Sequence, residues 1–88
     1  MNKESHELIE SLFAEMLLFL GERGLQNIHA KVAHYVDAGE YGLAFEATLD
    51  GCVKWGREIP ERTQEVFEKM VRAMEMDDAV LDVLTKRF

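Results

Sequence analysis

Apolar residues recur at helical spacing along almost the whole chain, and no segment alternates apolar and polar residues over more than a few positions. Positions three or four apart share one face of an α-helix, whereas strict alternation would indicate a strand. The pattern therefore predicts an all-α protein, a compact bundle of about five short helices. The predicted connections are short and no internal repeat is present, so residues 1–88 are expected to form a single domain.

The first three predicted helices cover residues 5–20, 26–38 and 40–55. Gly21 and Gly24 are expected to end the first, Gly39 the second and Gly56 the third, because glycine adopts the left-handed conformation common just past a helix end. One line of the first helix carries Leu8, Leu12, Met16 and Phe19, and the second groups Ile28, Val32, Tyr35 and Val36. The third has the longest apolar face, made of Tyr41, Ala44, Phe45, Thr48, Leu49, Cys52 and Trp55.

The fourth helix is expected to begin with Pro60 in its first turn, where proline lacks only a donor that would be unpaired anyway. Its inward residues are Val66, Phe67, Met70, Val71 and Met74. A short fifth helix is predicted to start near Asp77, a good N-cap residue, and to bury Val80, Leu81 and Leu84.

Leu17 and Leu18 fall outside the apolar line of the first helix, so the second half of that helix is apolar nearly all round. Such a helix is either central in the fold or part of an interface. A homo-oligomer formed through Leu17 and Leu18 is therefore one expectation.

Neither a membrane span nor a secretory signal is predicted. The longest apolar run, residues 16–20, is far shorter than the roughly 20 residues that cross a bilayer. Glu4, Glu7 and Glu10 stand where a signal peptide would need a basic patch, so a cytoplasmic location is expected. The single cysteine, Cys52, has no disulfide partner and lies on an apolar helix face, which predicts a buried thiol.

The residues that catalysis or metal binding would need are not grouped in this sequence. His29 and His34 are five positions apart, about 140° around a helix, so they are not expected to share a zinc ion. There is no Glu-x-x-His pair, no phosphate-binding glycine loop and no calcium loop. We therefore expect no enzyme activity, no catalytic residues, no metal and no cofactor.

The formal net charge of −7 makes nucleic acid a poor partner and favours a basic protein. The join at residues 75–78 resembles the turn of a DNA-binding helix-turn-helix, but Asp77, Asp78 and Asp82 would meet phosphates with the wrong sign. On the fourth helix, each of Glu65 and Glu68 precedes a base by four residues, the pattern of an ordinary solvated face.

The stretch from Asp37 to Asp50 is different, because it holds Asp37, Glu40, Glu46 and Asp50 with no Lys or Arg among them. Asp37 and Glu40 lie close to the predicted start of the third helix, where negative charge is favoured by roughly 0.3–1 kcal/mol. Asp50 has Lys54 four residues on. Glu46 and Asp50, however, form a like-charge pair four apart, which costs an isolated helix a few tenths of a kcal/mol.

Leu43 shares the helix face of Glu46 and Asp50, with Val53 beside it. An apolar anchor ringed by charged groups is a common arrangement in protein recognition, and the acids would speed encounter with a basic partner. The alternative is that Leu43 packs against the first helix and has no contact role.

Residues 37–46 read Asp-Ala-Gly-Glu-Tyr-Gly-Leu-Ala-Phe-Glu. This segment resembles the MafI-type immunity proteins. In that family a helix ends at a Gly-Glu pair, a Leu-Ala-hydrophobic-Glu run and a hydrophobic helix follow, and an Ile/Pro-initiated helix precedes a short final helix with an acidic cap. The corresponding residues here are Gly39-Glu40, Leu43-Ala44-Phe45-Glu46, Ile59-Pro60 and Met76-Asp77. The resemblance covers roughly the C-terminal two-thirds of the chain, and the first helix matches only in being amphipathic and of similar length.

This resemblance implies a cognate inhibitor of a polymorphic bacterial toxin, with the C-terminal nuclease domain of a secreted or contact-dependent toxin as its partner and an EndoU-type ribonuclease first among such domains. Combined with the charge pattern, it makes Asp37, Glu40, Leu43, Glu46 and Asp50 the candidate toxin contacts. Two other functions fit the residues. One is a homo-oligomeric helical adaptor, and the other is a DNA mimic that inhibits a nucleic-acid-binding enzyme.

Overall fold

The computed structural model describes residues 3–82, and this part of the chain is built from helices. They are α1 (Lys3–Glu22), α2 (Gln26–Asp37), α3 (Tyr41–Trp55), α4 (Glu61–Ala73) and one 3-10 turn, η1 (Asp78–Leu81). The all-α prediction is confirmed. The number of helices is corrected from about five to four, because the fifth is a single 3-10 turn within the described residues. Its expected core residue Leu84 lies outside them.

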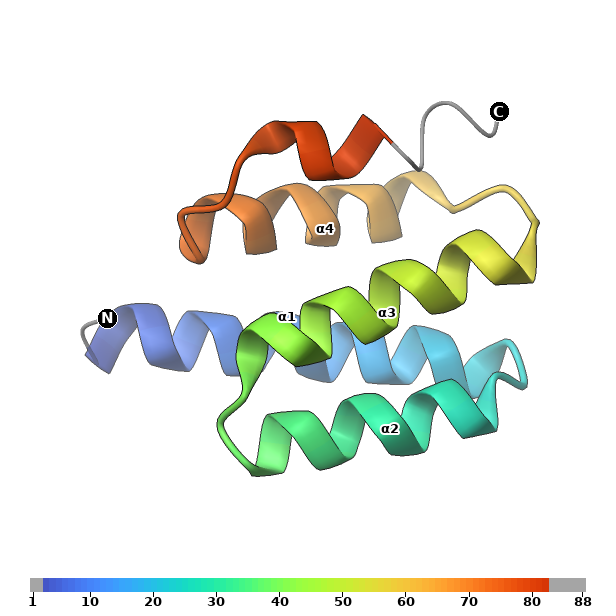
Figure 1. Ribbon diagram of the computed structural model, residues 1–88, viewed down its shortest axis with the longest axis horizontal. Helices are drawn as coiled ribbons and strands as arrows, with labels where there is room; N and C mark the ends of the chain where they lie inside the picture. The colour runs from blue at the N-terminus through green and yellow to red at the C-terminus, as the bar shows by residue number, and fades with distance from the viewer. Residues whose placement is uncertain (1–2, 83–88) are drawn as a thin grey trace.

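Consecutive α-helices run antiparallel and form a small bundle (Figure 1). Helix α2 packs against both α1 and α3, and α4 returns to pack against α1. The η1 turn folds back over α4. Because α2 and α3 lie side by side, the surface along their junction combines residues from both helices (Figure 1).

The core gathers the apolar faces of all four α-helices around three fully buried phenylalanines, Phe13, Phe45 and Phe67. The rings of Phe45 and Phe67 meet edge to face with centroids 5.9 Å apart, an arrangement that aromatic pairs favour. The other buried apolar residues are Ile9, Leu12, Met16, Phe19, Leu20, Val32, Tyr41, Ala44, Cys52, Ile59, Val66, Met70 and Val71. The predicted apolar faces of the third and fourth helices are therefore confirmed, although Leu49, Trp55 and Met74 are only half-buried.

The turn after α2 shows how these helices end. Gly39 has φ +74°, and its N–H donates to the carbonyl of Val36 at 3.0 Å. The N–H of Glu40 donates to the carbonyl of Tyr35 at 2.9 Å. These two bonds form a Schellman motif, which satisfies carbonyls that the helix leaves unpaired.

The same motif follows α1 and α4. After α1 the left-handed position is taken by Gly24 at φ +75°, and after α4 it is taken by Glu75 at φ +55°. The supporting bonds run from Gly24 and Leu25 to Gly21 and Leu20, and from Glu75 and Met76 to Arg72 and Val71. Glu75 thus adopts a conformation that costs any residue other than glycine roughly 1–2 kcal/mol.

Several positions differ from the sequence-based expectation. Leu8 was expected in the apolar line of the first helix, but its side chain is 48% exposed. Gly21 does not end α1, which continues to Glu22. Pro60 is the N-cap of α4 rather than a first-turn residue.

Candidate functional site

A shallow hollow lies along the junction of α2 and α3, at the segment that the sequence marked for recognition. It encloses about 210 Å³ and is lined by Lys31, Tyr35, Leu43, Glu46, Ala47 and Asp50. Leu43 is 45% exposed at this position, so the alternative that it packs away against the first helix is wrong. The structure therefore brings three of the five candidate contacts, Leu43, Glu46 and Asp50, to one surface.

The charges around this hollow are of both signs. Asp50 forms an ion pair with Lys54 at 3.0 Å, with both side chains well exposed. Exposed pairs of this kind contribute little to stability, roughly 0–1 kcal/mol. Glu46 takes part in none of the ion pairs formed between described residues, and neither does Lys31 on the opposite rim. The acidity expected of this hollow is thus reduced by Lys31 and Lys54, and of its two lining acids only Glu46 has no ion pair with a described residue.

Asp37 and Glu40 lie at the α2–α3 turn, beside the hollow but outside its lining. Both are exposed. Glu40 is the N-cap of α3 but makes no side-chain capping bond, and Asp37 is the last residue of α2. A negative charge at the C-terminal end of a helix is disfavoured by its dipole, so the stability of α2 does not explain Asp37. The contact roles of Asp37 and Glu40 stay predictions.

The fold places the two leucines of the apolar α1 segment, Leu17 and Leu18, in different environments. Leu17 is half-buried and packs against the core, whereas Leu18 is 63% exposed. The two leucines proposed as an oligomer contact are therefore not equivalent, and only Leu18 offers a largely free side chain.

A polar cluster that the sequence reading did not identify joins α1 to α3. The hydroxyl of the buried Tyr41 donates to Glu10 Oε2 at 2.8 Å, and His6 Nε2 lies 3.0 Å from the same hydroxyl oxygen. His6 and Glu10 are themselves 3.4 Å apart. Their spacing of four residues was visible in the sequence, but their joint contact with Tyr41 depends on how α1 and α3 cross.

This cluster joins α1 to α3, and Tyr41 is its buried member. Burial raises the pKa of the Tyr41 phenol, and the hydrogen bond to Glu10 and the negative charge of Glu10 raise it further. A phenol shifted in this direction stays protonated at neutral pH, so it is a poor nucleophile and a poor base. Through these hydrogen bonds, Tyr41 connects the first half of α1 to the start of α3.

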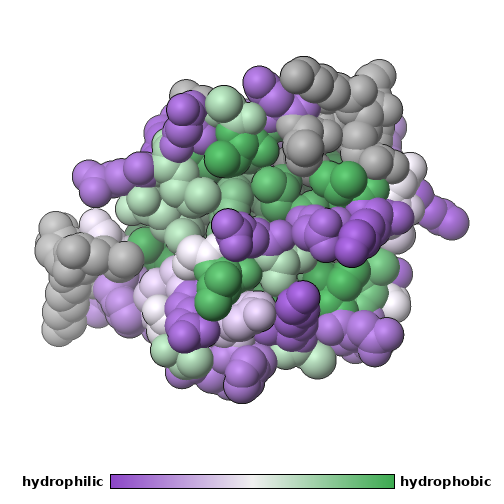
Figure 2. All heavy atoms as spheres, in the orientation of Figure 1, coloured by the Kyte–Doolittle hydropathy of each residue, from purple (hydrophilic) through white to green (hydrophobic). Residues whose placement is uncertain are grey.

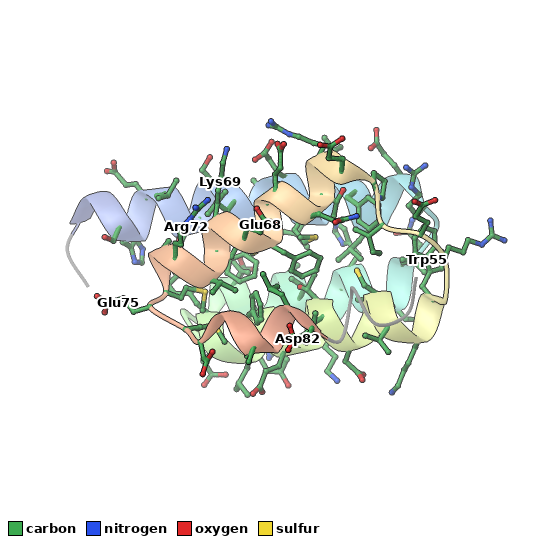
Figure 3. All side chains as sticks on the ribbon, turned by 90° about the horizontal axis from the view of Figure 1, so that it is seen from above. Trp55, Glu68, Lys69, Arg72, Glu75 and Asp82 are labelled. Atoms are coloured by element: carbon green, nitrogen blue, oxygen red, sulfur yellow. The ribbon has the colours of Figure 1, made fainter. Side chains whose placement is uncertain are left out.

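The charged face of α4 is exposed, as expected. Glu68, Lys69 and Arg72 lie along the outer surface of the helix (Figure 3). Neither Glu65–Lys69 nor Glu68–Arg72 is among the ion pairs between described residues. Instead Arg62 pairs with Glu15 of α1, which links two helices far apart in the sequence.

A second, wider hollow opens at the start of α4 and encloses about 630 Å³ between Glu58, Ile59, Pro60, Glu61 and Gln64. The amide of Gln64 donates to the carbonyl of Ile59 at 2.7 Å, and Ile59 itself is buried. Carboxylates near a helix N-terminus are favoured by its dipole. The hydrogen bond of Gln64 and the acids of this hollow are therefore explained by their roles at the N-terminus of α4.

The remaining histidines and the single cysteine lie on α2 and α3. His29 is half-buried and His34 is exposed. No group of three or more His, Cys, Asp or Glu side chains in the described part of the chain is placed to hold a metal ion. Cys52 is buried as expected, and burial raises the pKa of its thiol to about 11.

On the face shown in Figure 2, apolar patches are separated by rows of polar side chains rather than joined into one continuous area. Within residues 3–82, none of the helices combines the length and the apolar character that a membrane crossing requires. A scan against models of known protein families found no match, and searches of the curated proteins and of the solved structures found none either.

Proposed function

We propose that this protein is an immunity protein that binds the C-terminal nuclease domain of a secreted or contact-dependent bacterial toxin, an EndoU-type ribonuclease first among the candidates, and neutralises it. The observation that carries the proposal is the exposed Leu43 in the α2–α3 hollow, with Glu46 and Asp50 beside it. An apolar anchor flanked by charges is the composition of many binding hot spots.

Two further observations support a basic partner. The net charge of −7 favours encounter with a cationic surface, and a ribonuclease needs such a surface to hold phosphates. The segment that resembles the MafI-type immunity proteins also supplies Leu43 and Glu46 of this hollow. We propose that the chain acts in the cytoplasm, by binding rather than by catalysis, and without a cofactor.

The test is co-expression with the C-terminal domain of a large secreted protein encoded directly upstream, scored by growth of the host. The wild-type chain should restore growth. The double variant Glu46→Lys/Asp50→Lys should lose protection and bind the toxin domain at least tenfold more weakly. The loss should appear mainly in the association rate and should be largest at low salt, because exposed charges act chiefly on encounter.

A matched control is available on α4. The double variant Glu65→Lys/Glu68→Lys changes the net charge by the same amount on another exposed helix face, away from the hollow. It should protect as well as the wild type, and circular dichroism should show the same helix content in all three proteins. Equal affinity of the two double variants for the toxin domain would exclude the α2–α3 face as the binding surface.

The exposure of Leu18 favours a second candidate, a homo-oligomeric helical adaptor. Light scattering distinguishes the two functions. A stable dimer that becomes a monomer in the Leu18→Lys variant would support the adaptor, whereas a monomeric wild-type chain that binds the toxin domain one to one supports the immunity function. Leu17→Lys is not a suitable substitute, because that side chain packs against the core.

A further inference from the structure

The α2–α3 hollow is polarised across its width. Its α2 rim carries Lys31 and Tyr35, four residues apart, and its α3 side carries Glu46 and Asp50, also four apart. Residues with this spacing lie in a row along a helix, so the basic and acidic groups form opposite edges of one groove. Two of the six lining residues therefore lie on α2 and four lie on α3.

Between the two charged edges lies an apolar strip. Leu43 is 45% exposed, and Ala47, one turn later, is half-buried with only a methyl group to fill its position. A large side chain followed by a small one leaves room for an apolar side chain from outside. Rows of side chains on two neighbouring helices border a groove. A helix from another protein can pack a row of its own side chains into such a groove.

The unpaired charges of the hollow determine which charged side chains a partner helix needs. Glu46 and Lys31 form no ion pair with any described residue, whereas Asp50 is already paired with Lys54 at 3.0 Å. A partner that buried only basic groups here would place them beside Lys31. Complementary charge therefore requires Lys or Arg toward Glu46 and a carboxylate toward Lys31.

We propose that this hollow receives one amphipathic helix of a partner protein, which places an apolar side chain against Leu43 and Ala47, a basic side chain at Glu46 and an acidic side chain at Lys31. The proposal rests on the proposed function for the identity of the partner, and it adds the polarity of the segment that is recognised. Lys31 is then a specificity residue, since it rejects partner helices that carry only positive charge.

The test uses a displayed library of helical peptides with one fixed leucine and randomised flanking positions, selected on the wild-type protein. Enriched peptides should carry Lys or Arg three or four positions from the leucine on one edge and Asp or Glu on the other. Selection on the Lys31→Glu protein should replace the acidic preference by a basic one, while the preference opposite Glu46 stays the same. Selection on the Glu46→Lys protein should replace the basic preference opposite this position by an acidic one, while the preference opposite Lys31 stays the same.

Leu43→Asp and the milder Leu43→Ala should each lower the affinity of the protein for the enriched peptides at least tenfold. Both variants should keep the wild-type circular dichroism, because this side chain lies at the surface. The proposal is overturned if no peptide is enriched on the wild type, if the same peptides are enriched equally on Leu43→Asp, or if Lys31→Glu leaves the acidic preference unchanged.

Failure here is distinguishable from failure of the immunity function. Loss of toxin protection in Glu46→Lys/Asp50→Lys, together with no peptide enrichment, would retain immunity and overturn the helix-in-groove mode. Enrichment with the expected polarity, together with no protection against the toxin, would retain the groove and overturn immunity.

Discussion

At the scale of single residues, the most informative position is Glu75. Three helices end in the same pair of hydrogen bonds, and two of them place glycine at the left-handed position. Glu75 takes that conformation at φ +55°, in the exposed turn after α4 (Figure 3). Nothing in the structure explains the preference for glutamate there, and a negative charge just past a helix C-terminus is also disfavoured by the dipole.

Glu75→Gly should therefore stabilise the protein. Glycine adopts positive φ without steric cost, and part of this gain is offset by the greater freedom of glycine in the unfolded chain. We expect a net gain of about 0.5–1 kcal/mol, measured by urea unfolding, and a midpoint of thermal unfolding higher by roughly 2–8 °C for a domain of this size. Glu75→Gln removes only the charge, so it should raise the free energy of unfolding by less than Glu75→Gly does. Equal stability of the two variants would contradict the backbone explanation.

Cys52 yields a second prediction at this scale. Burial raises the pKa of its thiol to about 11, from the ordinary value of 9.0, so the unfolded chain ionises first as the pH rises. The stability that the neutral buried thiol contributes is complete below about pH 9 and is lost between about pH 9 and pH 11. Over that interval the wild type should lose more free energy of unfolding than Cys52→Ala does.

The comparison with Cys52→Ala is necessary because the pKa of Tyr41 is also raised, and Tyr41 contributes its own pH dependence in both proteins. A disulfide-exchange reagent provides the second measurement. At neutral pH it should label Cys52 only as fast as the protein opens, because the residue is 1% exposed. Rapid labelling of the native protein would show that the thiol is not enclosed.

At the scale of helices, the close approach of α2 and α3 depends on Gly51. A Cβ atom at this buried position would lie 2.7 Å from Cδ1 and from Cγ2 of Ile28. Gly42, in the first turn of the same helix, has open space around it. The same substitution should therefore have opposite effects at the two positions.

Gly51→Ala should destabilise the protein by about 1–2 kcal/mol, because overpacking outweighs the gain of roughly 1 kcal/mol in helix propensity. Gly42→Ala should stabilise it by roughly 0.5 kcal/mol. Both are measured by chemical unfolding. Adding Ile28→Ala should remove the penalty of Gly51→Ala, which a double-mutant cycle would show as a favourable coupling. Additive effects would mean that Ile28 and Gly51 do not interact.

The helices themselves were largely predictable from the sequence. The spacing of apolar residues located α2, α3 and α4 closely, and Gly39 and Gly56 marked real helix ends at φ +74° and +75°. Asp77 was correctly expected to be an N-cap, since its carboxylate accepts from the N–H of Ala79 at 2.9 Å. The turn that follows is 3-10 rather than α, a difference in local hydrogen bonding that apolar spacing does not encode.

The candidate site was predictable only within one helix. Leu43, Glu46 and Asp50 share a face of α3 by spacing alone, but Lys31 and Tyr35 reach the same hollow from α2 through helix packing. The contact of His6 and Glu10 with Tyr41 was missed for the same reason. Periodicity shows which face of a helix is apolar, but it does not show which polar residues two helices bring together.

At the scale of the whole molecule, the packing of α4 against α1 joins the two ends of the described chain. Arg62 pairs with Glu15, and the rings of Phe67 and Phe45 meet edge to face. The packing of α4 on α1 links residues far apart in the sequence, and so does the contact of Tyr41 in α3 with Glu10 in α1. Helix α2 packs on α1 and α3, its neighbours in chain order. The core is therefore completed only by the fourth helix.

This closure has a consequence for synthesis on the ribosome, where the chain emerges from its N-terminus. Until residues 61–73 leave the exit tunnel, α1 to α3 lack the partner that encloses Phe45, and their apolar faces stay open to other chains. We expect a nascent chain in this state to be prone to aggregation. A gene truncated within α4 would yield an aggregating fragment rather than a smaller folded protein.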